Sequence, residues 1–84
     1  MIKTGTLESS DCMIELRESN ERKIEIESIV FEQFGDQIYD VLKTTLDEYH
    51  VKAVFLRCID KGALDYTIKA RLKAALELWG VDHG

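Results

Sequence analysis

The chain has 84 residues, 45% of them hydrophobic, and a formal net charge of −5. This length accommodates one domain with a thin core, and the composition is that of a folded protein rather than a disordered one. The negative charge argues against nucleic-acid binding, which requires a basic surface. No segment has the apolar length of a membrane helix and no basic-then-apolar leader opens the chain, so we expect a soluble, cytoplasmic protein. Residues 1–4 and 81–84 are expected to form a mobile lead and a mobile tail.

Two alternating segments near the N-terminus predict an antiparallel hairpin. Residues 11–18 and residues 23–28 each alternate apolar and polar side chains, which is typical of half-buried strands. The polar residues 18–21 between them are typical of a short turn. The apolar positions are Cys12, Ile14 and Leu16 in the first segment, interrupted by Met13, and Ile24 and Ile26 in the second. The polar face of the hairpin is expected to face solvent.

The period then changes to that of amphipathic helices. Residues 36–49 predict a first helix with Asp36 as its N-cap, and residues 63–79 predict a second helix that Gly80 ends. Residues 51–59 are apolar on both faces, which indicates a central strand. The helical stripes are Ile38, Val41, Leu42, Thr45, Leu46 and Tyr49 in the first helix, and Leu64, Ile68, Leu72, Ala75, Leu76 and Trp79 in the second.

The predicted order is therefore β-β-α-β-α. Helices on one face of a small sheet bury the apolar side of both layers. We expect a two-layer α+β domain, with a mostly antiparallel sheet and two helices packed on one face.

Few residues suggest chemistry of their own. Cys12 and Cys58 lie among apolar residues and lack metal or redox spacing, so we interpret them as buried, reduced thiols. His50 and His83 have no second ligand at metal spacing, and no metal site is predicted. The chain has no nucleophile elbow and little core to hold an active site rigid, so no catalytic residue is predicted.

Two loop segments are candidates for function. In residues 60–65, "DKGALD", a structural turn at Gly62 is the favoured interpretation, and the alternative is that Lys61, Gly62 and the helix N-terminus meet an anion or a partner. Residues 5–11, "GTLESSD", offer two adjacent hydroxyls near the N-terminus. If the alternation of the first strand extends backward, Ser9 points outward and Ser10 inward. An outward hydroxyl near a flexible end is accessible to a modifying enzyme.

The segment "GTLESSDCMIEL" resembles the opening signature of the acyl carrier protein (gamma) subunit of citrate lyase. The similarity resumes at residues 33–38, "QFGDQI", at "DKGALD", and at residues 69–77, "KARLKAALE". It spans nearly the whole chain, and the two loop motifs together are fairly specific. The departures are a short lead before Gly5, an early end after Trp79, and Cys12 where an aliphatic residue is expected.

The resemblance implies a non-catalytic carrier subunit. Ser9 would hold 2'-(5''-phosphoribosyl)-3'-dephospho-CoA through a phosphodiester, with Glu8, Ser10 and Asp11 as its recognition context and a holo-carrier synthase as the transferase. The alpha subunit of the lyase would exchange an acetyl thioester on this arm for citryl. The beta subunit would then cleave the citryl thioester, so that citrate yields acetate and oxaloacetate. A long linker lets one thiol visit two sites at high effective concentration.

We further hypothesise that Glu8 and Asp11 repel stray phosphates. Neutralising both should then leave folding unchanged and alter the kinetics of modification. Two other functions remain open on the sequence. One is an α+β interaction or ligand-sensing domain without a covalent group, and the other, with the least support, is a small autonomous enzyme.

Overall fold

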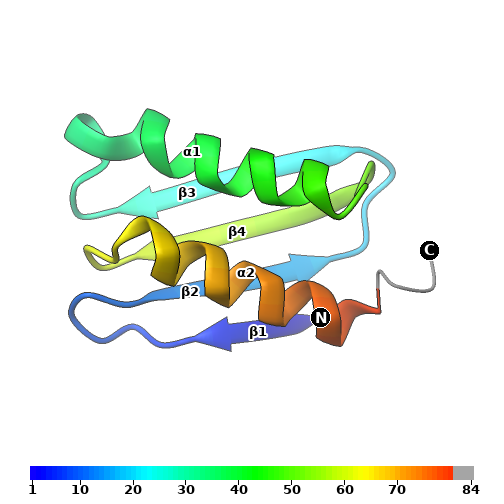
Figure 1. Cartoon of the computed structure of the whole chain (residues 1–84), viewed down its shortest axis with the longest axis horizontal. Helices are drawn as coiled ribbons and strands as arrows, with labels where there is room; N and C mark the ends of the chain where they lie inside the picture. Colours follow the sequence, from blue (N-terminus) through cyan, green and yellow to red (C-terminus); the bar gives the residue numbers. More distant parts are fainter. Residues whose placement is uncertain (81–84) are drawn as a thin grey trace.

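The computed structural model describes residues 1–80, which form a sheet of four strands with two helices on one of its faces (Figure 1). The elements in chain order are β1 (Ile2–Gly5), β2 (Cys12–Arg17), β3 (Arg22–Ser28), α1 (Phe31–Glu48), β4 (Val54–Asp60) and α2 (Asp65–Trp79). The predicted two-layer α+β class is confirmed, with one more strand than expected. The predicted tail, residues 81–84, and with it His83, lies outside the described residues.

The predicted hairpin is wrong, because β4 lies between the two strands that were expected to pair. The sheet order is β1-β2-β4-β3, in which β2 is antiparallel to both β1 and β4, and β3 is parallel to β4. Alternation shows which face of a strand is buried, but it does not determine which strand pairs with it. The polar segment 18–21 spans two strand spacings, roughly 10 Å, which four residues can bridge. The chain then reaches β4 from β3 through α1, as parallel pairing requires.

The N-terminal residues are an edge strand rather than a mobile lead. Ile2 pairs with Leu16 and Thr4 with Ile14, and the Thr4 hydroxyl donates a hydrogen bond of 2.7 Å to the carbonyl oxygen of Arg71 in α2. The expectation for residues 1–4 is therefore wrong. A strand of four residues is too short to show a clear alternation, so the hydrophobic pattern of the sequence did not predict β1.

Helix α1 begins at Phe31, five residues before Asp36, and Val30 occupies the N-cap position that we assigned to Asp36. Gly35, the residue before Asp36, is a buried residue inside the helix. A Cβ atom at Gly35 would stand 2.9 Å from the ring of Phe31. The glycine therefore makes room for an aromatic ring one turn earlier, and this packing outweighs its low helix propensity.

Strand β4 is central, as predicted, but only one of its faces is fully covered. Val54, Leu56 and Cys58 are buried against the helices, whereas Arg57 on the outer face is exposed. Helix α2 ends at Gly80, whose φ of 82° provides the predicted left-handed stop. The buried core comprises Cys12, Ile14, Leu16, Ile38, Leu42, Leu46, Val51, Val54, Leu56, Cys58, Ile68, Leu72, Ala75 and Leu76.

No helix within residues 1–80 combines the length and the apolar character that crossing a membrane requires. Both cysteines are free and buried, as predicted. A hydrogen bond with Cys12, together with burial, raises the pKa of the Cys58 thiol. Cys58 thus behaves as a small apolar side chain rather than a nucleophile.

Gly5 is a position of this framework where no side chain fits. Its φ is 86°, and an added Cβ atom would overlap the carbonyl oxygen of Cys12. We expect Gly5→Ala to lower the free energy of unfolding by at least about 2 kcal/mol, from the left-handed backbone and the clash together. Urea unfolding followed by circular dichroism measures this. Lys3→Ala, at an exposed position of the same strand, is the control and should stay within about 0.5 kcal/mol of the parent; equal effects of the two changes would contradict the assignment.

Candidate functional site

The loop between β1 and β2, residues 6–11, presents both candidate hydroxyls to solvent. Ser9 is exposed, as predicted. Ser10 is also exposed, so the prediction that it points inward is wrong. The strand alternation does not extend back to Ser10, because β2 starts at Cys12 and Ser10 has a φ of 66°. The Asp11 amide donates to the Glu8 carbonyl oxygen at 3.1 Å, which closes a turn around the two serines.

The backbone of this loop is bound to the loop that follows β4. The Ser10 amide donates to the carbonyl oxygen of Lys61 at 2.8 Å, and the Lys61 amide donates to the carbonyl oxygen of Asp11 at 2.9 Å. These two bonds continue the β2–β4 pairing beyond the ends of the strands. The two candidate segments of the sequence are therefore neighbours in space.

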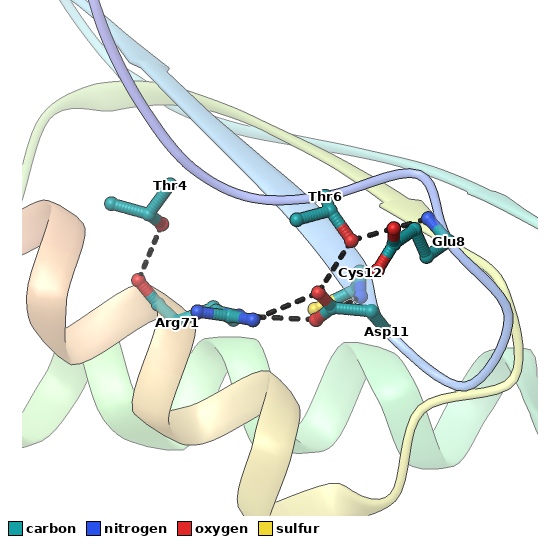
Figure 2. Close-up of polar contacts among 6 residues, drawn as sticks. All are labelled: Thr4, Thr6, Glu8, Asp11, Cys12 and Arg71. Carbon is teal, nitrogen blue, oxygen red and sulfur yellow. Dashed lines mark hydrogen bonds and ion pairs between the residues drawn. The ribbon is translucent and has the colours of Figure 1, made fainter.

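The carboxylate of Asp11 anchors the end of the loop to helix α2 (Figure 2). Its two oxygens accept hydrogen bonds from Arg71, one from Nε at 3.0 Å and one from Nη2 at 2.8 Å. The Thr6 hydroxyl donates to the same carboxylate at 2.6 Å, and the Cys12 amide at 2.7 Å. The Asp11 side chain is only 13% exposed. A bidentate pair of this kind fixes the orientation of both side chains.

These contacts determine the charge state of Asp11. The hydrogen bonds from Arg71, first, and from Thr6 hold the pKa of the Asp11 carboxyl well below its ordinary value of 3.8. The same contact raises the pKa of the Arg71 guanidinium. The Asp11 carboxylate is thus part of the hydrogen-bond framework of the loop, which argues against the hypothesis that neutralising Glu8 and Asp11 together leaves folding unchanged. The expected effect of the two carboxylates on the kinetics of modification stays a prediction. Glu8, which is exposed, remains as the acidic side chain next to Ser9.

The segment "DKGALD" forms the structural turn that we favoured. Asp60 is 1% exposed, and its carboxylate accepts hydrogen bonds from the Ser28 hydroxyl at 2.7 Å, the Gly62 amide at 3.2 Å and the Ala63 amide at 2.9 Å. Gly62 has a φ of 90°, which favours glycine. Asp60 thus supplies the turn with the acceptors that its backbone needs. Lys61 is half-buried in the middle of the turn, beside the loop that carries Ser9.

Sequence reasoning missed two residues that position the loop, Thr6 and Arg71. Arg71 lies in α2, one residue before Leu72 of the buried stripe, and a basic residue beside an apolar stripe is too common to attract notice. Its partner is 60 positions away in the chain. The proximity of Thr6 to Asp11 in sequence was visible, but the bond between them depends on how the loop turns.

His50, the other imidazole that we considered, is exposed after the end of α1 and has a φ of 57°. Within residues 1–80, no group of three or more histidine, cysteine, aspartate or glutamate side chains is arranged to hold a metal ion. The polar groups near Ser9 therefore form a framework of hydrogen bonds around an exposed hydroxyl.

Comparison with known proteins gives three similarities. A family model described as "ACP: Malonate decarboxylase delta subunit (MdcD)" matches residues 1–79. The citrate lyase acyl carrier protein of Halothermothrix orenii is 51% identical over 74 residues, covering 87% of this chain and 79% of its own length. That of Treponema denticola is 44% identical over 72 residues, covering 86% of this chain and 83% of its own length.

A further similarity, in addition to those three in sequence, is structural. A chain in the crystal structure of a Pseudomonas malonate decarboxylase hetero-tetramer in complex with malonate superposes with a TM-score of 0.74. The match covers 93% of this chain and 81% of the other, at 17% sequence identity. At that identity the similarity concerns the fold alone.

The Asp11–Arg71 pair should contribute to stability in a pH-dependent way. Because the folded-state pKa of Asp11 is lower than its unfolded-state pKa, the contribution is complete above about pH 4 and is lost as the pH falls through the folded-state value. We expect Asp11→Asn to lower the free energy of unfolding at pH 7 by about 1–3 kcal/mol, and this difference should shrink on acidification below about pH 4. Urea unfolding at a series of pH values measures both effects.

Glu8→Gln is the matched control, because it removes the same charge from the same loop at an exposed site. It should change the free energy of unfolding by less than about 0.5 kcal/mol. If Asp11→Asn were as mild as Glu8→Gln at pH 7, the anchoring role of Asp11 would be refuted.

Proposed function

This chain belongs to the family of citrate lyase acyl carrier proteins and malonate decarboxylase delta subunits, and we propose that it is the acyl carrier subunit of a citrate lyase. The relatives at 44% and 51% identity are named as citrate lyase carriers. The decarboxylase chain resembles it in fold at 17% identity. Sequence similarity thus favours citrate over malonate as the substrate of the complex.

The observation that carries the proposal is the exposure of Ser9 on a loop with fixed ends. Its hydroxyl would bear 2'-(5''-phosphoribosyl)-3'-dephospho-CoA through a phosphodiester. The residues fit such a group, since Ser9 is exposed and the neighbouring Asp11 charge is compensated by Arg71. The group supplies a thiol that carries acetyl and citryl units as thioesters.

The chain's own residues would hold and present this group without catalysing the reaction. Asp11, Arg71 and the Ser10–Lys61 backbone bond set the direction of the loop, and Glu8 and Ser10 lie on either side of the attachment point. The alpha and beta subunits of the lyase would act on the thioester, and a holo-carrier synthase would attach the group. We propose that residues 1–84 act as one carrier domain in the cytoplasm.

Intact mass after co-expression with the modifying enzymes tests the attachment. We expect the parent chain to gain the mass of the group, Ser9→Ala to gain nothing, and Ser10→Gly to gain the full increment. Glycine is the suitable control at position 10, because it accepts the φ of 66° that alanine would adopt only with strain. An unmodified chain in an active complex would refute the proposal, and an increment that survives Ser9→Ala would move the attachment elsewhere.

We also propose that Lys61 contacts the phosphodiester at Ser9. The backbone of Lys61 is hydrogen-bonded to both Ser10 and Asp11, so Lys61 is a direct neighbour of the attachment loop. Lys61→Gln should slow modification severalfold without changing the site. Lys3→Gln, which removes the same charge from exposed residue 3 of β1, should modify at the parent rate. Equal rates for both variants would exclude Lys61 from this role.

A further inference from the structure

An apolar pocket of about 430 Å³ opens between the beginning of α1 and the beginning of α2. The beginnings of both helices lie at the same end of the molecule as the β1–β2 loop (Figure 1). Its apolar and aromatic lining comes from the start of α1 and from the segment that leads into α2, and includes Val30, Phe34, Ile38, Ala63, Leu64 and Tyr66. The volume is within the range of small-molecule sites.

We propose that this pocket holds the purine base of the nucleotide attached to Ser9. The inference rests on the proposed function, since it concerns the covalent group assigned there. It adds a binding site for one part of that group, made of residues to which the sequence assigned no such role.

The pocket is within reach of the attachment point. Gly62 lines the pocket and directly follows Lys61, whose carbonyl oxygen accepts the bond of 2.8 Å from the Ser10 amide. The path from the Ser9 Cα atom to the Gly62 Cα atom through this bond is about 10 Å or less, from standard bond lengths. In the proposed group a phosphate and one ribose precede the adenosine. The base is therefore the first large uncharged part that a neighbouring pocket would meet.

The lining suits a neutral base and disfavours phosphate. Among the described residues that line the pocket none is a lysine or an arginine, whereas Asp60 and Asp65 contribute carboxylates. Phe34 is 40% exposed and Tyr66 is 72% exposed, so two aromatic rings at this pocket are open to a partner. Stacking on aromatic side chains is a general means of binding a base.

Two polar groups at the pocket, which are hydrogen-bonded to each other, would exchange that contact for the edge of a purine. Gln37 of α1 donates from Nε2 to both carboxylate oxygens of Asp65, at 3.0 and 2.9 Å, and both residues are exposed. A glutamine amide pairs well with adenine at N6 and N7, and a carboxylate accepts from an exocyclic amino group. The pantetheine arm is a poorer occupant, because a thiol held there could not reach the partner subunits.

Fluorine NMR of the chain labelled with 3-fluorotyrosine tests this inference. The chain has three tyrosines, Tyr39, Tyr49 and Tyr66, and within the described part of the chain only Tyr66 lines the pocket. We expect modification to shift the Tyr66 resonance and to leave the Tyr39 resonance in place. Cleaving the pyrophosphate enzymatically releases the pantetheine arm but leaves the adenosine on Ser9, so the Tyr66 shift should survive it.

Thermal unfolding provides a second measurement. Modification should raise the Tm of the parent chain, and this gain should be lost in Tyr66→Ala and kept in Tyr39→Ala, which makes the same change at another exposed tyrosine of 43% exposure. A chain that gains mass but shows no Tyr66 shift would overturn the pocket assignment and leave the proposed function standing. A shift lost with the pantetheine arm would also overturn it, and failure to gain mass would overturn both proposals.

Discussion

The bidentate contact between Asp11 and Arg71 is the interaction on which the presentation of Ser9 depends. An exposed loop of small polar residues is ordinarily among the more variable parts of a fold. Here its last residue is bound to a helix by two charge-assisted hydrogen bonds, at 3.0 and 2.8 Å, and the same carboxylate accepts from Thr6 at the beginning of the loop. One side chain thus closes the loop on itself and attaches it to α2. Ile68 and Leu72 pack α2 into the core. The position of the exposed Ser9 therefore depends on the packing of the apolar interior.

The second support of the loop explains why two distant motifs occur together. "GTLESSD" and "DKGAL" are almost fifty residues apart, yet the Ser10 amide donates to Lys61 and the Lys61 amide donates to Asp11. The buried carboxylate of Asp60 accepts hydrogen bonds from the amides of Gly62 and Ala63. These bonds hold the "DKGAL" backbone in place, and it in turn supports the β1–β2 loop. The glycines of both motifs have positive φ values, 86° at Gly5 and 90° at Gly62. The two motifs are therefore halves of one structural unit, which is a physical reason for their combined specificity.

The sequence predicted the positions of the secondary-structure elements better than it predicted which strands pair with each other. Alternation located β2 and β3, and the 3.6-residue stripes of both helices face the core, with Leu42 and Leu72 fully covered. The exception is Leu64, which was assigned to the second stripe but is the N-cap residue before α2 and is 60% exposed. Periodicity is a local property, and it reports which side of an element is buried. Strand pairing is not local, so the insertion of β4 between β2 and β3 left no trace in the pattern. Ser9 was correctly predicted to be exposed. Ser10 was wrongly predicted to point inward, because its own left-handed backbone conformation interrupts the alternation on which that prediction was based.

The charge around Ser9 differs from the charge of the whole chain. The net charge of −5 and the neighbouring residues Glu8 and Asp11 suggest a repulsive environment for a phosphodiester. In the fold, however, Arg71 compensates Asp11, and Lys61 is held beside the loop, so the local balance is close to neutral. The remaining acidic residues are spread over other surfaces, such as Glu25 and Glu27 on the outer face of β3. Under the proposed function, acidity elsewhere would steer a basic partner surface to the protein without hindering a phosphodiester at Ser9. Long-range attraction and local tolerance of phosphate would then belong to different parts of the same small domain.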